Sequence, residues 1–292
     1  MKYTNGIRKL IVNADDFGLH HSINEAVEDA HQNGILTSAS LVVNGESFEK
    51  AIAIAKRNKK LGVGIHLTLN GENPVASVSQ IPSLIGTDGK LFENHITFCL
   101  NILRRKICLE HIKIEIEAQL DKFFQAGLIP THVDSHRHIH LFPPVFRVVK
   151  EVLRKHNLTK VRFLNVPFSD YFYGNFSKVI MERFLKLSIF SKDKNMQSPD
   201  YFYGAFNSGS IDFKYFKKTI IKLRPGISEI NFHPGKNNVL LKEKYGIWEK
   251  RYHWKCNWER EYNILLNPDI KTLIQKHNIS IINHLEIKGV RD

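Results

Sequence analysis

Residues 131–140 constrain the fold more than any other part of this sequence. Within these ten residues, polar metal-binding side chains occupy alternate positions: His132, Asp134, His136, His138 and His140. Alternate residues of a β-strand point to the same face, so the spacing predicts a strand that aims all five side chains in one direction. Burying such a row without partners would cost about 2–7 kcal/mol for each neutral polar group. Because histidine is the commonest protein ligand of transition metals, the segment predicts a metal site and an enzyme.

Short apolar runs alternate with amphipathic segments along the chain. Runs typical of buried strands cover residues 9–14, 37–43, 61–69, 160–164, 228–232 and 280–283. Helical periodicity covers residues 48–57, 112–124, 143–155, 177–190 and 259–276, and a further helix is expected after residue 18, capped by Ser22 and Glu25 and ended by Gly34. The alternation predicts an α/β fold with a mostly parallel sheet, open or closed as a barrel. We expect one domain over residues 1–292. Residues 167–215 are rich in aromatic side chains and only partly interpretable.

The net charge is strongly positive. Forty-two lysines and arginines against 29 acidic residues give +13, with a pI near 9.5. Such a balance attracts phosphates, and a nucleic-acid binder is therefore one alternative function. The basic residues are spread along the chain, however, and no DNA- or RNA-binding motif is present. We expect no nucleic-acid partner, and the charge is better suited to a solvated surface that attracts a phosphorylated substrate.

Cysteine usage and hydropathy indicate a cytoplasmic protein. The three cysteines are scattered, without the spacing of a thiolate zinc site or a disulfide framework. No apolar run approaches the roughly 20 residues that span a bilayer, and the first residues contain no secretory signal. We therefore expect no membrane partner. The sequence leaves the oligomeric state open, a homodimer included.

Polar residues follow several of the expected strands. Asp15 and Asp16 come after the first strand, His66 lies near the end of the third, and His233 follows a later one. Since working groups of such folds gather at the carboxyl ends of the strands, these residues are expected to meet the histidine-rich segment. Each also has a simpler interpretation, because an aspartate pair often caps a helix and a lone histidine often packs in a core.

Four motifs, in a fixed order, carry a resemblance to a known family. They are Asn-Ala-Asp-Asp-Phe-Gly-Leu at 13–19, Gly-Ile-His-Leu at 64–67, Thr-His-Val-Asp-Ser-His-Arg-His-Ile-His at 131–140 and His-Pro-Gly at 233–235. The sequence resembles the YdjC-like family of carbohydrate deacetylases, which includes chitooligosaccharide deacetylases. Residues 236–292 are similar only loosely, through Arg260-Glu261 and Leu265-Leu266.

The resemblance implies a fold and a reaction. The fold would be a distorted (β/α) barrel similar to the polysaccharide deacetylases, with one divalent metal ion, magnesium or zinc. The reaction would be hydrolysis of an N-acetyl group from a small amino sugar or a short chitooligosaccharide. Carried over by motif, Asp16, His66 and His136 would bind the metal, and Asp15 would be the general base. His233 is the candidate general acid.

Further residues are expected around this centre. Asp134 would orient a histidine or the attacking water, and Arg162 would pair with Asp15 or Asp134 unless it is a surface arginine. His138 would lie beside the metal ligands or the substrate. Trp254 and Arg251 would form part of the wall that binds the sugar, and the lysines nearby make a sugar phosphate a reasonable substrate.

Two other functions remain open. His138 and His140 form a His-x-His pair, which amidohydrolases use on a strand of a (β/α) barrel, although there it usually follows the first strand. A non-catalytic protein that binds a metal or a sugar would show the same ligands without turnover.

Overall fold

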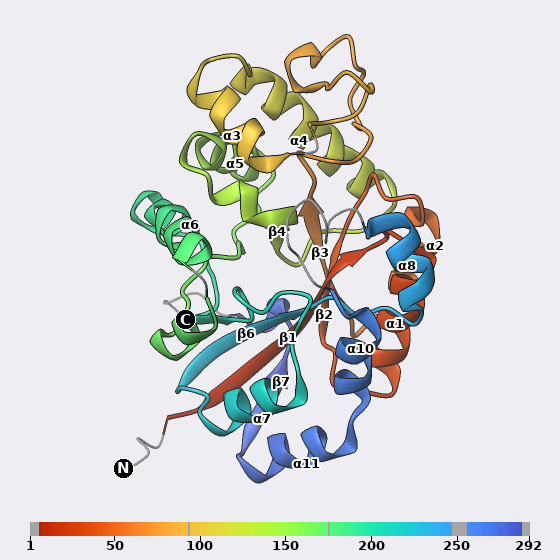
Figure 1. Cartoon of the computed structure of the whole chain (residues 1–292), viewed down its shortest axis with the longest axis vertical. Helices are drawn as coiled ribbons and strands as arrows, with labels where there is room; N and C mark the ends of the chain where they lie inside the picture. The colour runs from red at the N-terminus through yellow and green to blue at the C-terminus, as the bar shows by residue number, and fades with distance from the viewer. Residues whose placement is uncertain (1–5, 93, 175, 247–255, 288–292) are drawn as a thin grey trace.

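In the computed structural model, one curled sheet is surrounded by helices (Figure 1). The structure describes residues 6–92, 94–174, 176–246 and 256–287. Within them the sheet has seven strands, namely β1 (Arg8–Phe17), β2 (Ser38–Leu41), β3 (Gly62–Leu67), β4 (Val133–Ser135), β5 (Tyr201–Tyr203), β6 (Gly226–Phe232) and β7 (Ile279–Ile282).

β1 is the central strand of the sheet. The strand order is β4-β3-β2-β1-β6-β5, with β7 also beside β1, and every pairing among these strands is parallel. β7 pairs with the first part of β1 and β2 with its second part, while β6 runs along the other side. Leu10, Ile11 and Val12 are fully buried, as expected for a parallel strand covered on both faces. The predicted distorted (β/α) barrel is confirmed.

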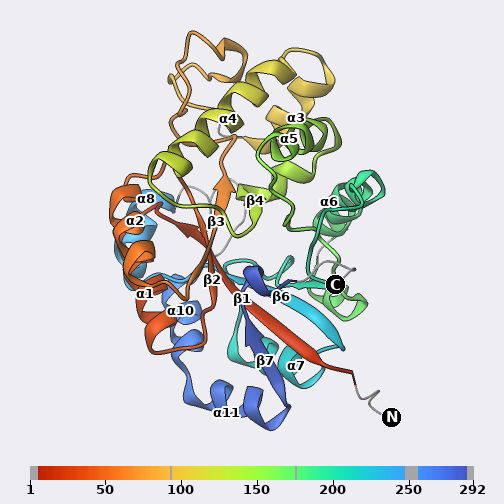
Figure 2. The ribbon, with the colours of Figure 1, turned by 180° about the vertical axis from the view of Figure 1, so that it is seen from behind.

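The helices cover the outside of this half-barrel. They are α1 (His21–Gln32), α2 (Phe48–Arg57), α3 (His95–Leu103), α4 (Leu109–Gln125), α5 (Pro143–Lys155), α6 (Phe176–Lys186), α7 (Phe213–Ile221), α8 (Asn238–Tyr245), α10 (Trp258–Leu266) and α11 (Pro268–Lys276). Seen from both sides, α3, α4 and α5 lie together beyond β3 and β4, while α7 and α11 lie at the opposite end (Figure 2). Among the described residues, no helix combines the length and the hydropathy needed to cross a membrane.

The prediction of one strand over residues 131–140 is wrong. β4 ends at Ser135, and His136–Leu141 form a 3-10 helix, η2. Arg137 and His138 have φ angles of 57° and 55°, in the left-handed region, so the chain turns sharply there. His138 and His140 therefore do not continue the face of the strand that carries Asp134.

Two helix predictions are also corrected. The first helix is capped by His20, whose side chain accepts a hydrogen bond from the Ser22 backbone, and not by a box of Ser22 and Glu25. The predicted helix over 259–276 is two helices, α10 and α11, because Pro268 cannot continue the first and instead begins the second.

Two strand predictions change as well. Residues 160–164 pair with their neighbours only through isolated bridges at Lys160 and Val161, because a regular ladder does not form there. A strand missing from the sequence prediction, β5, lies within the uninterpreted segment 167–215 and pairs with β6.

Candidate functional site

Asp15 and Asp16 lie at an irregular end of β1. The pairing register between β1 and β2 shifts between Ala14 and Phe17, and Asp16 has a φ of 65°. A bulge of this kind re-aims side chains, and aspartate tolerates the left-handed region better than most residues. The predicted turn at Asp15 and Asp16 is therefore a bulge inside the strand, and the two carboxylates point to different partners.

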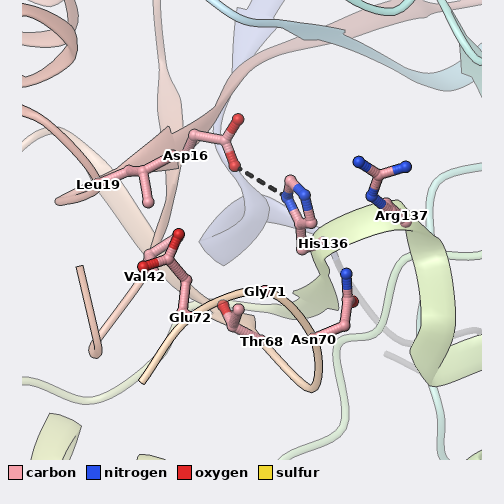
Figure 3. Close-up of a pocket in the computed structure, with 9 residues that line it drawn as sticks. All are labelled: Asp16, Leu19, Val42, Thr68, Asn70, Gly71, Glu72, His136 and Arg137. Atoms are coloured by element: carbon pink, nitrogen blue, oxygen red, sulfur yellow. Dashed lines mark hydrogen bonds and ion pairs between the residues drawn. The ribbon is translucent and has the colours of Figure 1, made fainter. Parts of the chain in front are cut away.

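Asp16 lies between two histidines (Figure 3). Its Oδ1 is 3.2 Å from Nδ1 of His136, which follows β4, and 3.6 Å from Nε2 of His66, which lies in β3. One ligand atom from each of the three residues lies within 4.8 Å of the others. The curl of the sheet thus brings together the three residues that the sequence predicts as metal ligands.

The donor set suits a divalent cation. Two imidazoles and one carboxylate are the number and kind of protein ligands found in catalytic zinc sites. Asp16 Oδ2 is buried, and no described residue forms a hydrogen bond with it. Such an atom would be costly to bury without a partner, which a cation would provide.

His66 is oriented by a second carboxylate. Its Nδ1 is 2.8 Å from Oδ1 of Asp134, which leaves Nε2 directed at Asp16. Carboxylate–histidine–metal triads have this arrangement. Burial lowers the pKa of His66, but the negative charges of Asp134, Asp15 and Asp16 outweigh it and raise that pKa to about 9. The site therefore carries a surplus of negative charge that favours a cation.

Asp15 is held differently from Asp16. Arg162 donates to both of its oxygens, at 2.9 and 3.0 Å, and amides of Asn13 and Asn231 donate to them at 2.9 and 3.2 Å. Asp15, His66 and Asp134 also place ligand atoms within 4.8 Å. Because the oxygens of Asp15 already have protein donors, Asp16 is the better ligand of the two.

Arg162 is a buried arginine, and the alternative of a surface position is wrong. Its guanidinium lies 2.7 Å from Oδ2 of Asp134 and 2.7 Å from Oε1 of Glu229, in addition to its bonds with Asp15. Burial alone would raise the pKa values of Asp15 and Asp134, but the positive charge of Arg162 outweighs it and holds both below their usual range.

His233 reaches the same centre from the carboxyl end of β6. Its Nε2 is 3.9 Å from Oδ2 of Asp15 and 3.4 Å from the hydroxyl of Ser208. Burial lowers the pKa of His233. Its backbone amide donates to the carboxylate of Glu261 in α10, which also accepts from the amide of Ile211.

The other histidines of the segment lie elsewhere. The ring of His138 packs edge-on against Phe202, with centroids 5.5 Å apart, and burial followed by the charge of Arg162 lowers its pKa to about 3. His140 contacts Ser135 and the Arg162 carbonyl, and His132 stacks on His284 at 3.5 Å. These three histidines are therefore packed into the protein and stand apart from the Asp16 cluster.

A small pocket opens onto the metal ligands (Figure 3). Besides Asp16 and His136, its walls consist of Leu19, Val42, Thr68, Asn70, Gly71, Glu72 and Arg137. Burial raises the pKa of Glu72 to about 7. Trp254 and Arg251, expected in the sugar-binding wall, lie outside the described residues.

Three polar residues near the centre were not identified from the sequence. Asn13 and Asn231 bind Asp15, and Glu229 binds Arg162. A signal for Glu229 was present, since it is a charged residue inside an apolar strand, where a buried charge needs a partner. Nothing in the sequence pattern linked Glu261 to His233.

The fold and the cluster define a class: a curled, parallel (β/α) barrel with an Asp-His-His group at the carboxyl ends of its strands. The chain belongs to the YdjC-like protein family, whose sequence profile matches residues 9–276. The resemblance expected from the motifs is confirmed.

Several relatives are named as deacetylases. The carbohydrate deacetylase of Clostridium beijerinckii is 39% identical over 150 residues, covering 51% of this chain and 58% of the relative. That of Thermoanaerobacter pseudethanolicus is 29% identical over 97% of this chain and 100% of its own length. The chitooligosaccharide deacetylase of Proteus mirabilis is 33% identical, with 65% and 78% covered. The first of these matches therefore spans less than two thirds of the relative.

A solved structure has the same architecture. A proposed cellobiose-phosphate cleavage protein of Enterococcus faecalis V583 superposes with a TM-score of 0.76 at 25% identity. The match covers 95% of this chain and 98% of that one, so the whole fold is shared.

Proposed function

We propose that this protein is a metal-dependent hydrolase that removes an N-acetyl group from an amino sugar or a short chitooligosaccharide. The observation that carries the proposal is the cluster of Asp16, His66 and His136, with Asp15 fixed beside it by Arg162. The names of the relatives support a carbohydrate substrate. We further propose that residues 1–292 act as one domain in the cytoplasm.

Asp16, His66 and His136 would hold one divalent ion, magnesium or zinc. Such an ion, when bound, polarises the acetyl carbonyl and lowers the pKa of water. Asp134 keeps His66 in the orientation that directs Nε2 at Asp16. The negative charge around His66, which raises its pKa, favours the binding of a cation.

Asp15 would accept the proton of the attacking water. Arg162 lowers the pKa of Asp15, so this carboxylate is always ionised but is a weak base. A weak base is sufficient only for a water that is already acidified, which agrees with a position next to the metal ligands. The guanidinium and the two asparagine amides also fix the direction of its oxygens.

His233 would protonate the leaving amine. Its Nε2 lies on the side of Asp15, at 3.9 Å from Oδ2. Glu261 accepts from the His233 backbone and thereby fixes the turn that carries the imidazole. We propose that Arg251, Trp254 and His138 take part in substrate binding or in its surroundings, as the sequence suggests.

Acetate release tests the proposal. We would measure it from diacetylchitobiose and from its 6-phosphate, with protein loaded with magnesium or with zinc. Metal-dependent release that His136→Ala abolishes and His277→Ala leaves unchanged is the expected result, since His277 lies at the end of α11, away from the cluster. Bound metal without release from either sugar would instead favour another metal-dependent amidohydrolase or a protein that only binds metal or sugar.

A further inference from the structure

One surface of the molecule exposes an unusual number of large apolar side chains. It consists of α6 and the 3-10 helices on either side, η3 (Phe168–Tyr173) and η4 (Leu187–Ser191). Phe172, Phe176 and Phe190 are 80%, 83% and 88% exposed. We call this surface the α6 face, and its other exposed apolar residues are Phe168, Ile180, Met181, Phe184 and Leu187.

The α6 face is contiguous along the helix. Phe176, Ile180 and Phe184 are each four residues apart, so they are neighbours on one side of α6. Leu185 is buried and Val179 packs on the core, so the helix also has an apolar inner side. A helix that is apolar all round is normally covered, and a contiguous exposed patch marks an interaction site. In both views α6 lies at the outer edge of the molecule (Figures 1 and 2).

Basic residues border the α6 face. Lysines and an arginine occur throughout this stretch: Lys178, Arg183, Lys186, Lys192 and Lys194. Its two acidic residues are engaged elsewhere, because Glu182 accepts from Tyr171 and Asp193 pairs with Arg154. The surface therefore combines exposed phenylalanines with a positive rim.

This combination favours a negatively charged lipid surface over a second copy of the chain. Each copy carries a formal charge of +13, so pairing through this face would bring two positive rims together. Anionic headgroups attract lysine and arginine, and the boundary below them accommodates aromatic and aliphatic side chains. Helices that lie in the plane of a membrane interface have this composition.

We propose that the α6 face docks the protein on the surface of a membrane that contains anionic phospholipid. Phe172, Phe176 and Phe190 would enter the boundary between headgroups and acyl chains, and the basic rim would contact the phosphates. This binding is peripheral, so it differs from the expectation of no membrane partner, which considered only segments that span. It does not depend on the proposed deacetylation.

Flotation with vesicles tests the docking. The full chain should float with vesicles of phosphatidylglycerol and phosphatidylethanolamine, less so at high salt, and hardly with phosphatidylcholine alone. The variant Phe172→Ser/Phe176→Ser/Phe190→Ser should lower the partition coefficient at least about tenfold. A matched control is Leu103→Ser/Ile129→Ser, which removes side chains 62% and 78% exposed outside the α6 face and should bind normally.

A second variant separates charge from apolar contact. Arg183→Glu/Lys194→Glu should weaken binding to the anionic vesicles without changing the fold, since Arg183 and Lys194 are exposed. Absence of flotation, or a triple serine variant that binds like the unaltered chain, would overturn the proposal. Sedimentation that shows a dimer dissociated by the serine substitutions, without flotation, would assign the face to a second copy instead.

Discussion

Arg162 donates two hydrogen bonds to Asp15, from Nη2 to Oδ1 at 2.9 Å and from Nη1 to Oδ2 at 3.0 Å. The same guanidinium contacts Asp134 and Glu229, and all four side chains are buried. One cation thus offsets three carboxylates in the interior of the barrel, beside the candidate metal ligands.

Replacing Arg162 should therefore be costly. Arg162→Met leaves three buried carboxylates without their cation, and we expect the free energy of unfolding to fall by about 3–5 kcal/mol. Urea denaturation measures the change. Arg57→Met is the control, because Arg57 pairs with Glu28 at the surface and should contribute little. A stable Arg162→Met variant would mean that other groups neutralise these carboxylates.

Asp15→Asn separates an enzyme from a binding protein. The amide keeps the shape of the side chain but cannot take a proton from water, so we expect turnover to fall about 10²–10⁴-fold. Metal affinity should change little, since the ligands Asp16, His66 and His136 are untouched. Acetate release and calorimetric titration with the metal measure the two quantities. Unaltered turnover in this variant would remove Asp15 from the role of base.

Much of the fold was predictable from the sequence because local pattern and tertiary structure agree. Residues 48–57 form α2 with the predicted ends, and β1 and β3 occur where apolar runs indicate strands. The histidine-rich segment misled because two residues in the left-handed region, Arg137 and His138, end the strand pattern, and no local residue preference requires that turn. Pro268 was a readable helix break that the periodicity of residues 259–276 concealed.

The site was predictable at its motifs and less so at its supports. Asp16, His66 and His136 come from three separate segments, and only strand ends in a common fold indicate that they meet. Glu261 supports His233 from a helix 28 residues further on, through a backbone amide that no side-chain pattern reveals. Asn13 and Asn231 are polar residues inside β1 and β6, whose role as donors to Asp15 follows from the strand register.

Asp134 should control metal affinity through His66. Its Oδ1 is 2.8 Å from His66 Nδ1, and its Oδ2 accepts from Ser40 at 2.7 Å. In Asp134→Asn the ring loses the carboxylate that fixes its orientation and its basicity, so we expect affinity for the divalent ion to fall about 10–100-fold. Calorimetric titration measures the affinity. Asp170→Asn is the control, because Asp170 is a buried carboxylate that binds Tyr215 and not the site.

Glu261 should make stability depend on pH. Burial raises the pKa of Glu261 from 4.5 to about 8, although the amides of His233 and Ile211 oppose this shift. The folded protein therefore holds this proton over a range in which the unfolded chain has lost it. The stabilising contribution is fully present below about pH 4.5 and is lost as the pH rises through about 8.

Glu261→Gln removes this titration. Between about pH 5 and pH 8, the free energy of unfolding of the unaltered protein should fall with rising pH more steeply than that of the variant, because only the former gives up the Glu261 proton. Urea denaturation at several pH values within that range measures both slopes. Equal slopes would show that Glu261 is ionised throughout, held by the two backbone amides that donate to it.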